Sequence, residues 1–150
     1  MKNRSVPTDA PLPHVSYRDV GKASAWLSVT FGFVEHYRYT GAGGTVAGAQ
    51  MHLGDSWFML HRAKPGDRSP AQLGYGTQSV TIFVPEVEAH YQRSKAADAK
   101  IVEELHVTVY GERQYGAQDV DGHLWIFSQH AKDVDPAEWG ATMAPRRKTL

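Results

Sequence analysis

Apolar residues recur at helical spacing in two segments of the chain. The first runs from Val20 to Phe31; it follows Asp19, a residue type that caps helix N-termini, and it precedes Gly32, which suits a helix C-terminus. The second, residues 86–97, places Val87, His90, Tyr91 and Ser94 along one face. The pattern therefore predicts two helices of similar length.

Shorter segments in which apolar and polar residues alternate surround these helices, and such alternation is typical of β-strands. The predicted strands are residues 14–17, 33–39, 45–53 and 56–62 before the second helix, and 78–84, 99–102, 107–110, 113–119 and 123–130 around it. Residues 63–76 hold two prolines and three glycines and are predicted to be a linker. Asp135-Pro136-Ala137-Glu138 predicts a short C-terminal helix.

A single offset of 67 residues relates the two halves of the chain. It relates Leu12 to Ser79, Val20 to Val87, Val34 to Ile101, and Phe58-Met59-Leu60 to Trp125-Ile126-Phe127. We interpret this as an internal duplication of a β-α-β-β-β unit. The sequence thus predicts an α+β fold in one domain, with module 1 at about 12–62, the linker at 63–76, module 2 at 77–130 and a helical tail at 131–150.

Composition narrows the possible partners. The 16 basic and 16 acidic side chains cancel, so no nucleic-acid partner is expected. The chain has no Cys, which removes disulfides and thiol chemistry and is compatible with a cytoplasmic location. No apolar run is long enough to predict a membrane span, and residues 1–13 do not have the pattern of a secretory signal.

Several segments resemble the vicinal oxygen chelate superfamily, which includes glyoxalases, bleomycin-resistance proteins and dioxygenases. They are PHVSYRDVGKASAWLSVTFGF, GDSWFMLH and SVTIFVPEVEAHYQRSKAADAKIV, followed by YGERQYGAQDVDGHLWIFSQH, which is most similar to the bleomycin-resistance and PhnB-like branch. The resemblance extends from about Leu12 to His130. It implies two half-barrels of four strands around a cavity, and a homodimer with sites at its interface.

Metal-dependent members of this superfamily hold a divalent ion with His, Glu or Gln side chains from the first and last strand of each half. The matching positions here are Leu12, Met59, Ser79 and Ile126. Leu and Ile have no donor atom, a thioether suits soft ions and a hydroxyl is a weak ligand, so no metal cofactor is expected at the usual site. A shifted divalent-metal site from His14, His52 and His61 remains the alternative.

The same strand phasing assigns an inward face of apolar, aromatic and a few polar residues, a mixture typical of small-molecule pockets. The inward residues are His14, Ser16, Gln50, His52, Trp57, Met59, His61, Thr81, Phe83, Leu124, Ile126 and Ser128. All but Ser16, Leu124 and Ser128 are candidate ligand-binding residues. Arg113 of the YGERQY segment is a further candidate, because an Arg can bind a carboxylate or phosphate through two nitrogens. The alternative for Arg113 is a surface ion pair. A planar ligand could stack on Trp57 or Phe83. Alternatively, these side chains fill the half-barrels as core.

The opposite face, with Phe58, Leu60, Trp125 and Phe127, is expected to pack against the helices, and His123 to make a structural hydrogen bond. The resemblance and the inward face together favour a metal-free protein that sequesters a small hydrophobic or aromatic compound, as drug-binding resistance proteins do. The alternative is a lyase- or isomerase-type enzyme that uses His14, His52 or His61, with or without a divalent metal. His14 and His61 are its candidate catalytic residues, because imidazole titrates near neutral pH.

Overall fold

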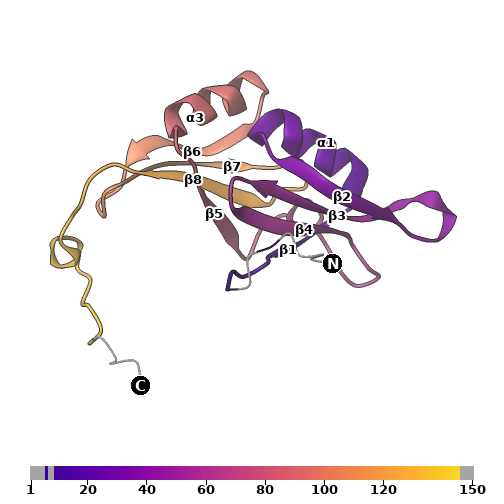
Figure 1. The fold of residues 1–150 in the computed structure, drawn as a ribbon, viewed down its shortest axis with the longest axis horizontal. Coiled ribbons are helices and arrows are strands. Elements are labelled where there is room, and N and C mark those ends of the chain that lie inside the picture. Colours follow the sequence, from indigo (N-terminus) through magenta and orange to yellow (C-terminus); the bar gives the residue numbers. More distant parts are fainter. Residues whose placement is uncertain (1–5, 7–8, 146–150) are drawn as a thin grey trace.

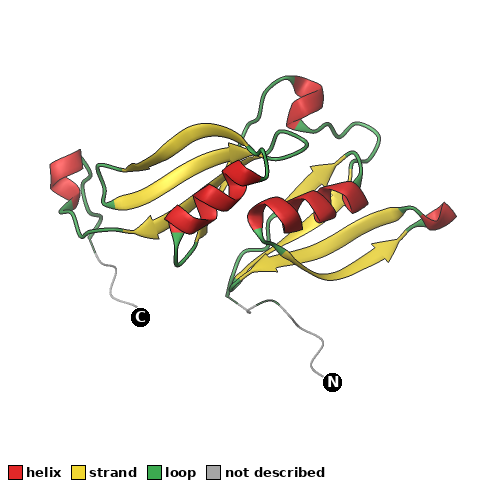
Figure 2. Cartoon of the chain, turned by 90° about the horizontal axis from the view of Figure 1, so that it is seen from above, coloured by secondary structure: helices red, strands yellow, loops and turns green. Residues whose placement is uncertain are grey.

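The computed structural model describes residue 6 and residues 9–145. These residues form two modules that lie side by side, each a four-stranded sheet with one long helix (Figures 1 and 2). Module 1 contains β1 (His14–Tyr17), α1 (Val20–Phe31), β2 (Val34–Thr40), η1 (Ala42–Gly44), β3 (Val46–Leu53) and β4 (Ser56–Arg62). Module 2 contains β5 (Ser79–Phe83), α3 (Val87–Ala96), β6 (Lys100–Val107), β7 (Glu112–Gln118) and β8 (Leu124–His130). Between and after the modules lie α2 (Pro70–Leu73) and η2 (Pro136–Trp139).

The two sheets have the same topology. Their strand orders are β1-β4-β3-β2 and β5-β8-β7-β6. β1 runs parallel to β4, and β5 runs parallel to β8. The other neighbouring strands are antiparallel. His14 lies opposite Met59 in module 1, and Thr81 lies opposite Ile126 in module 2. Both members of the second pair follow those of the first by 67 residues, so the backbone repeats with the offset that the sequence predicted.

Helix α1 begins and ends where the sequence indicated. The Asp19 side chain accepts a hydrogen bond from the backbone N–H of Lys22 at 3.0 Å, which satisfies one of the free donors of the first turn. At the other end Gly32 has a φ of 77°, a left-handed conformation that its missing Cβ allows, and its N–H bonds the carbonyl of Ser28.

One core joins the two modules beneath the helices. Both helices cover the same side of the molecule (Figure 1), and the aromatic side chains under them meet across the module boundary. The Phe33 ring lies 4.7 Å from that of Phe58 and 5.1 Å from that of Trp125, and Phe31 lies 4.9 Å from Phe127. The predicted packing of Phe58, Trp125 and Phe127 against the helices is confirmed, since all are buried.

Helix α3 also contacts the end of α1 through polar groups. The Nε2–H of His90 donates to the carbonyl of Phe31 at 2.8 Å, so its Nδ1 accepts from the Tyr115 hydroxyl at 2.7 Å. Burial lowers the pKa of His90 and raises that of Tyr115. The Arg93 guanidinium donates to the carbonyls of Ser28 and Val29, where a helix leaves acceptors without partners.

The turn between β7 and β8, residues 119–123, is the second link between the modules. The Asp119 side chain accepts from the Tyr17 hydroxyl of β1 at 2.6 Å and from Trp125 Nε1 at 2.9 Å. Its other oxygen accepts from the backbone N–H groups of Asp121 and His123 at 3.0 Å each. Buried carboxylates persist when their oxygens are hydrogen-bonded in this way. Burial is the main reason that the pKa of Tyr17 is raised, and Asp119 adds to it.

Side chains on both sides of that turn strengthen the link. Arg18 pairs with Asp121 through two nitrogens, at 2.9 and 2.7 Å. His123 Nε2 donates to the Ser16 carbonyl at 2.8 Å, which is the structural hydrogen bond expected of this histidine. The linker joins the same turn, because the N–H of Ala71 donates to the Asp121 carbonyl at 2.9 Å.

Two details differ from the sequence-based expectation. The separate strands at 99–102 and 107–110 are wrong, since β6 runs unbroken over Lys100–Val107 and residues 108–111 turn into β7. The linker contains the short helix α2.

The predicted short C-terminal helix is confirmed as a 3₁₀ helix over Pro136–Trp139, with Asp135 as its N-cap. The Gln114 side chain donates to the Glu103 carboxylate of β6 at 3.0 Å. Residues 146–150 of the predicted tail lie outside the described residues. No helix within the described part of the chain is long and apolar enough to cross a membrane.

Candidate functional site

Each sheet has one face that points away from its helix, which we call the open face. Successive side chains of a strand point to opposite faces, so the residues that alternate with those packed under the helix define it. Tyr37 and Tyr39 are 44% and 43% exposed on this face of module 1, and Phe83 is 63% exposed on that of module 2. On module 1 the open face carries His14, Ser16, Tyr37, Tyr39, Gln50, His52, Trp57, Met59 and His61. On module 2 it carries Thr81, Phe83, Gln114, Leu124, Ile126 and Ser128.

Nine of the ten candidate ligand-binding residues thus lie on the open faces. Gln50 and Met59 lie at the base of the open face of module 1, with 4% and 7% of their surface exposed. Arg113 is the exception: it extends from the helix-covered face of β7 and forms an ion pair with Glu88 of α3. We therefore leave Arg113 out of the candidate site.

Trp57 lies in a cluster of aromatic rings. The His52 ring is nearly parallel to the indole, at 4.4 Å between centroids and 22° between planes. The His36 ring meets the indole edge-on at 5.5 Å. The three rings come from three adjacent strands, and such contacts hold an indole in a fixed orientation.

His14 and His61 form a second imidazole cluster on neighbouring strands. Nδ1 of His14 and Nε2 of His61 are in hydrogen-bond contact, and the ring centroids lie 4.6 Å apart. One ring must donate and the other accept, so the neutral pair shares one proton. Burial lowers the pKa of His61, and the nearby charges of His14 and Lys64 lower it further.

The three imidazoles considered for a shifted metal site do not converge. His52 Nδ1 contacts the Gly54 carbonyl at 3.2 Å, away from His14 and His61. Throughout residues 9–145 there is no group of three or more His, Cys, Asp or Glu side chains that could hold an ion. The expectation of three histidines in one cluster is therefore corrected to a pair.

The four positions that carry metal ligands in related enzymes also do not fit an ion. Leu12 precedes β1, and Ile126 lies at the centre of β8, and neither side chain has a donor atom. The Met59 sulfur accepts a weak hydrogen bond from the Tyr37 hydroxyl at 3.8 Å. Ser79 alone retains an oxygen, and one hydroxyl does not hold a divalent ion. No chemical step at this site can be assigned to a metal.

Two cavities lie between the turn that joins β3 to β4 and the first strand of module 2. Trp57 and Thr81 line one of about 210 Å³ together with Pro13, so it joins β4 to β5. Phe83 lines a larger one of about 650 Å³ beside Leu53 and the start of α3. Each of these two cavities is therefore lined by residues from both modules.

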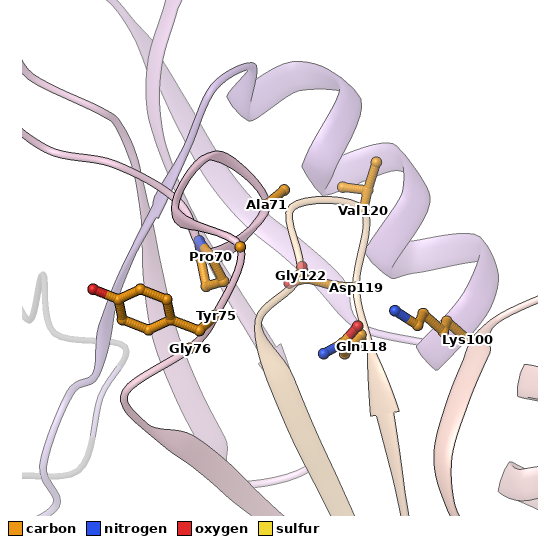
Figure 3. Close-up of a pocket in the computed structure, with 10 residues that line it drawn as sticks. Pro70, Ala71, Tyr75, Gly76, Lys100, Gln118, Asp119, Val120 and Gly122 are labelled. Carbon is orange, nitrogen blue, oxygen red and sulfur yellow. The ribbon is translucent and has the colours of Figure 1, made fainter.

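A further cavity of about 360 Å³ lies beside the turn between β7 and β8 (Figure 3). Figure 3 shows Pro70 and Tyr75 of the linker on one side and Lys100 and Gln118 on the other. Asp119 belongs to its wall, but both its oxygens are already hydrogen-bonded within the link between the modules. We interpret this cavity as the space left where the linker crosses the turn.

Sequence reasoning missed Tyr37 and Tyr39 as site residues. It also missed Arg68 of the linker, which lines a cavity of about 160 Å³ beside β1. The two tyrosines are two positions apart, which is a signal for a shared strand face, but a bulge between Glu35 and Tyr37 shifts the register of β2. Unbroken alternation from Val34 would have placed His36 rather than Tyr37 on the open face. The linker gave no periodic signal at all.

Known proteins share this architecture. The crystal structure of TioX from Micromonospora sp. ML1 superposes with a TM-score of 0.66 at 35% identity and covers 81% of this chain and 99% of that one. The fosfomycin resistance protein FosX from Listeria monocytogenes, at 16% identity, has a TM-score of 0.61 over 84% of this chain and 96% of its own. An uncharacterized protein of Mycobacterium tuberculosis H37Rv is 28% identical over 137 residues, which are 88% of this chain and 81% of the relative.

The family comparison agrees with the topology. Residues 12–127 match the model of the Glyoxalase/Bleomycin resistance protein/Dioxygenase superfamily. That range includes both β-α-β-β-β modules and the link between them. The chain therefore belongs to the glyoxalase/bleomycin-resistance/dioxygenase superfamily, also called the vicinal oxygen chelate superfamily.

Proposed function

We propose that this protein binds and sequesters a small hydrophobic or aromatic compound on its open faces, without an ion at the four chelating positions. The observation that carries the proposal is the set of exposed aromatic side chains there: Tyr37, Tyr39 and Phe83 are all more than two-fifths exposed. Large exposed apolar side chains on one face mark binding surfaces. Gln50, His52 and Thr81 supply the few polar groups that orient a ligand.

We also propose that the protein acts as a homodimer. The cavity that Trp57 and Thr81 line has a volume of about 210 Å³. Pockets for drug-sized ligands have roughly 300–1,000 Å³. A second copy laid over the open faces would enclose a larger volume and bury the exposed rings. A homodimer would thus enlarge the cavity beside Trp57, whereas the cavity of about 650 Å³ that Phe83 lines has this size within one chain.

The family supports a role in resistance. The superfamily takes part of its name from bleomycin resistance protein, and the Listeria relative is a fosfomycin resistance protein. Sequestration of a drug would need no catalytic group, which agrees with the aliphatic residues at Leu12 and Ile126. A cytoplasmic setting for this role is compatible with the absence of Cys.

The contact between His14 and His61 favours a second candidate, an enzyme of the lyase or isomerase type. A pair that shares one proton can take up a proton from a bound compound at one ring and return it from the other. Turnover of a bound compound, lost in His14→Ala and His61→Ala, would favour this candidate over sequestration.

Calorimetric titration with naphthamide, a neutral planar probe, tests the main proposal. Trp57→Ala should weaken binding roughly tenfold, because an aromatic pair contributes about 0.5–1.5 kcal/mol beyond the area it buries. Trp26→Ala is the matched control, since that indole packs on Phe31 at 5.1 Å in α1 and should lower stability without changing affinity. Equal losses of affinity and stability in Trp57→Ala would assign the residue to the core.

The dimer has a separate test. Light scattering should give twice the mass of one chain, and Tyr39→Glu on the open face should shift the population toward the monomer. A monomer at all concentrations would refute the proposed homodimer while leaving the probe titration informative.

A further inference from the structure

A small cavity of about 160 Å³ lies between β1 and the linker, at one edge of the open face of module 1. Its lining includes His14, Ser16, Arg68, Thr77 and Gln78. A carboxylate, sulfonate or phosphate group fits within this volume.

Arg68 contributes a permanent positive charge to the wall of this cavity, and its side chain is exposed. Within the part of the chain that the structure describes, the Arg68 guanidinium makes no hydrogen bond or ion pair, and neither Asp nor Glu lines the cavity. Asp67 is the neighbouring carboxylate, and its side chain accepts from the backbone N–H of Lys64 at 3.2 Å. An Arg without a carboxylate partner on a cavity wall is suited to bidentate binding of an oxyanion.

Neutral donors line the same cavity as the guanidinium. Ser16 and Thr77 have hydroxyl groups, and Gln78 has an amide that can donate two hydrogen bonds. His14 adds a donor when His61 donates to its Nδ1, because the neutral ring then carries its proton on Nε2. The wall thus offers donors from β1 and the linker to one small volume.

From these observations we propose that the cavity binds an oxyanion. His14 belongs both to this cavity and to the open face, so the oxyanion has two possible sources. It is either a free inorganic anion or the acidic group of an aromatic compound held on the open face. The second case rests on the proposed small-molecule binding, and the first is independent of it.

Titration calorimetry with matched probes tests this. The probes are naphthoate, its neutral analogue naphthamide, and sodium sulfate. Wild-type protein should bind naphthoate at least tenfold more tightly than naphthamide, and Arg68→Gln should remove that difference while leaving naphthamide unchanged. Arg62→Gln is the matched control: it is an exposed Arg at the end of β4 outside the cavity, so the preference for naphthoate should persist.

The outcomes separate the two sources and the two proposals. Sulfate binding that is lost in Arg68→Gln, without a preference for naphthoate, assigns the cavity to a free anion. Failure of both naphthalene probes with sulfate still bound refutes aromatic binding and retains the oxyanion site. If Arg68→Gln and Thr77→Val, both folded by circular dichroism, bind naphthoate and sulfate as the wild type does, the oxyanion site is refuted.

Discussion

Asp119→Asn tests whether the hydrogen bonds of the turn between β7 and β8 hold the two modules together. The carboxylate accepts four hydrogen bonds, two from Tyr17 and Trp125 and two from backbone N–H groups. An amide has one oxygen and one NH₂ group. Its best placement keeps the oxygen on the backbone donors and lets the NH₂ donate to the Tyr17 hydroxyl. The Trp125 N–H then faces another donor.

The expected loss follows from that placement. A buried donor without a partner costs about 1–3 kcal/mol, and the two backbone hydrogen bonds lose the extra strength of a charged acceptor, roughly 1 kcal/mol each. We expect Asp119→Asn to lower the free energy of unfolding by about 3–5 kcal/mol. Tyr17→Phe removes a single hydrogen bond to the carboxylate and should cost about 1.5–3 kcal/mol.

Urea unfolding followed by tryptophan fluorescence measures both variants. The slope of the transition should stay unchanged if the folded and unfolded states expose the same surface. A loss below about 1 kcal/mol in Asp119→Asn, or one no larger than in Tyr17→Phe, would refute the idea that this carboxylate fixes the modules relative to each other.

Two further substitutions test other contacts. Burial lowers the pKa of His90 below its ordinary 6.5, so the unfolded chain takes up the proton first as the pH falls. The free energy of unfolding should therefore reach its full value above pH 6.5 and decline below it. His90→Gln should reduce this decline, and His36→Gln, a change at an exposed position, should not. Gly122 has a φ of 82°, and an added Cβ would lie 3.1 Å from the backbone nitrogen of Ala71. Gly122→Ala should thus lower the denaturation midpoint more than Gly140→Ala, where φ is 86° and the space is open.

The fold could be predicted from the sequence because the patterns that indicate it are local or occur twice along the chain. Asp19 and Gly32 mark the two ends of α1 by side-chain and backbone chemistry that needs no tertiary contact. The offset of 67 residues appears again in the pairing of His14 with Met59 and Thr81 with Ile126. A duplicated unit provides two independent observations of the same pattern.

The residues of the candidate site could be predicted only in strands whose side chains alternate regularly between the two faces of the sheet. Trp57 and His61 lie on β4, which has no irregularity, and strand phasing placed them on one face. The bulge in β2 reversed the faces of Tyr37 and Tyr39, and a single extra residue of this kind leaves no trace in hydropathy. The environment of Arg68 depends on how the linker crosses β1, which no local pattern encodes.

The placement of the core has a consequence for how this protein can change. Folding depends on the aromatic layer beneath the helices and on the polar links at the turn, and the uncovered side of each sheet contributes little to either. Apart from the buried Gln50, Met59, Gln114 and Ser128, positions on that uncovered side can mutate at little cost to the chain's ability to fold. A lineage built on this plan can remodel that surface within a few substitutions, and a designer can randomise its exposed positions in a library with few misfolded members.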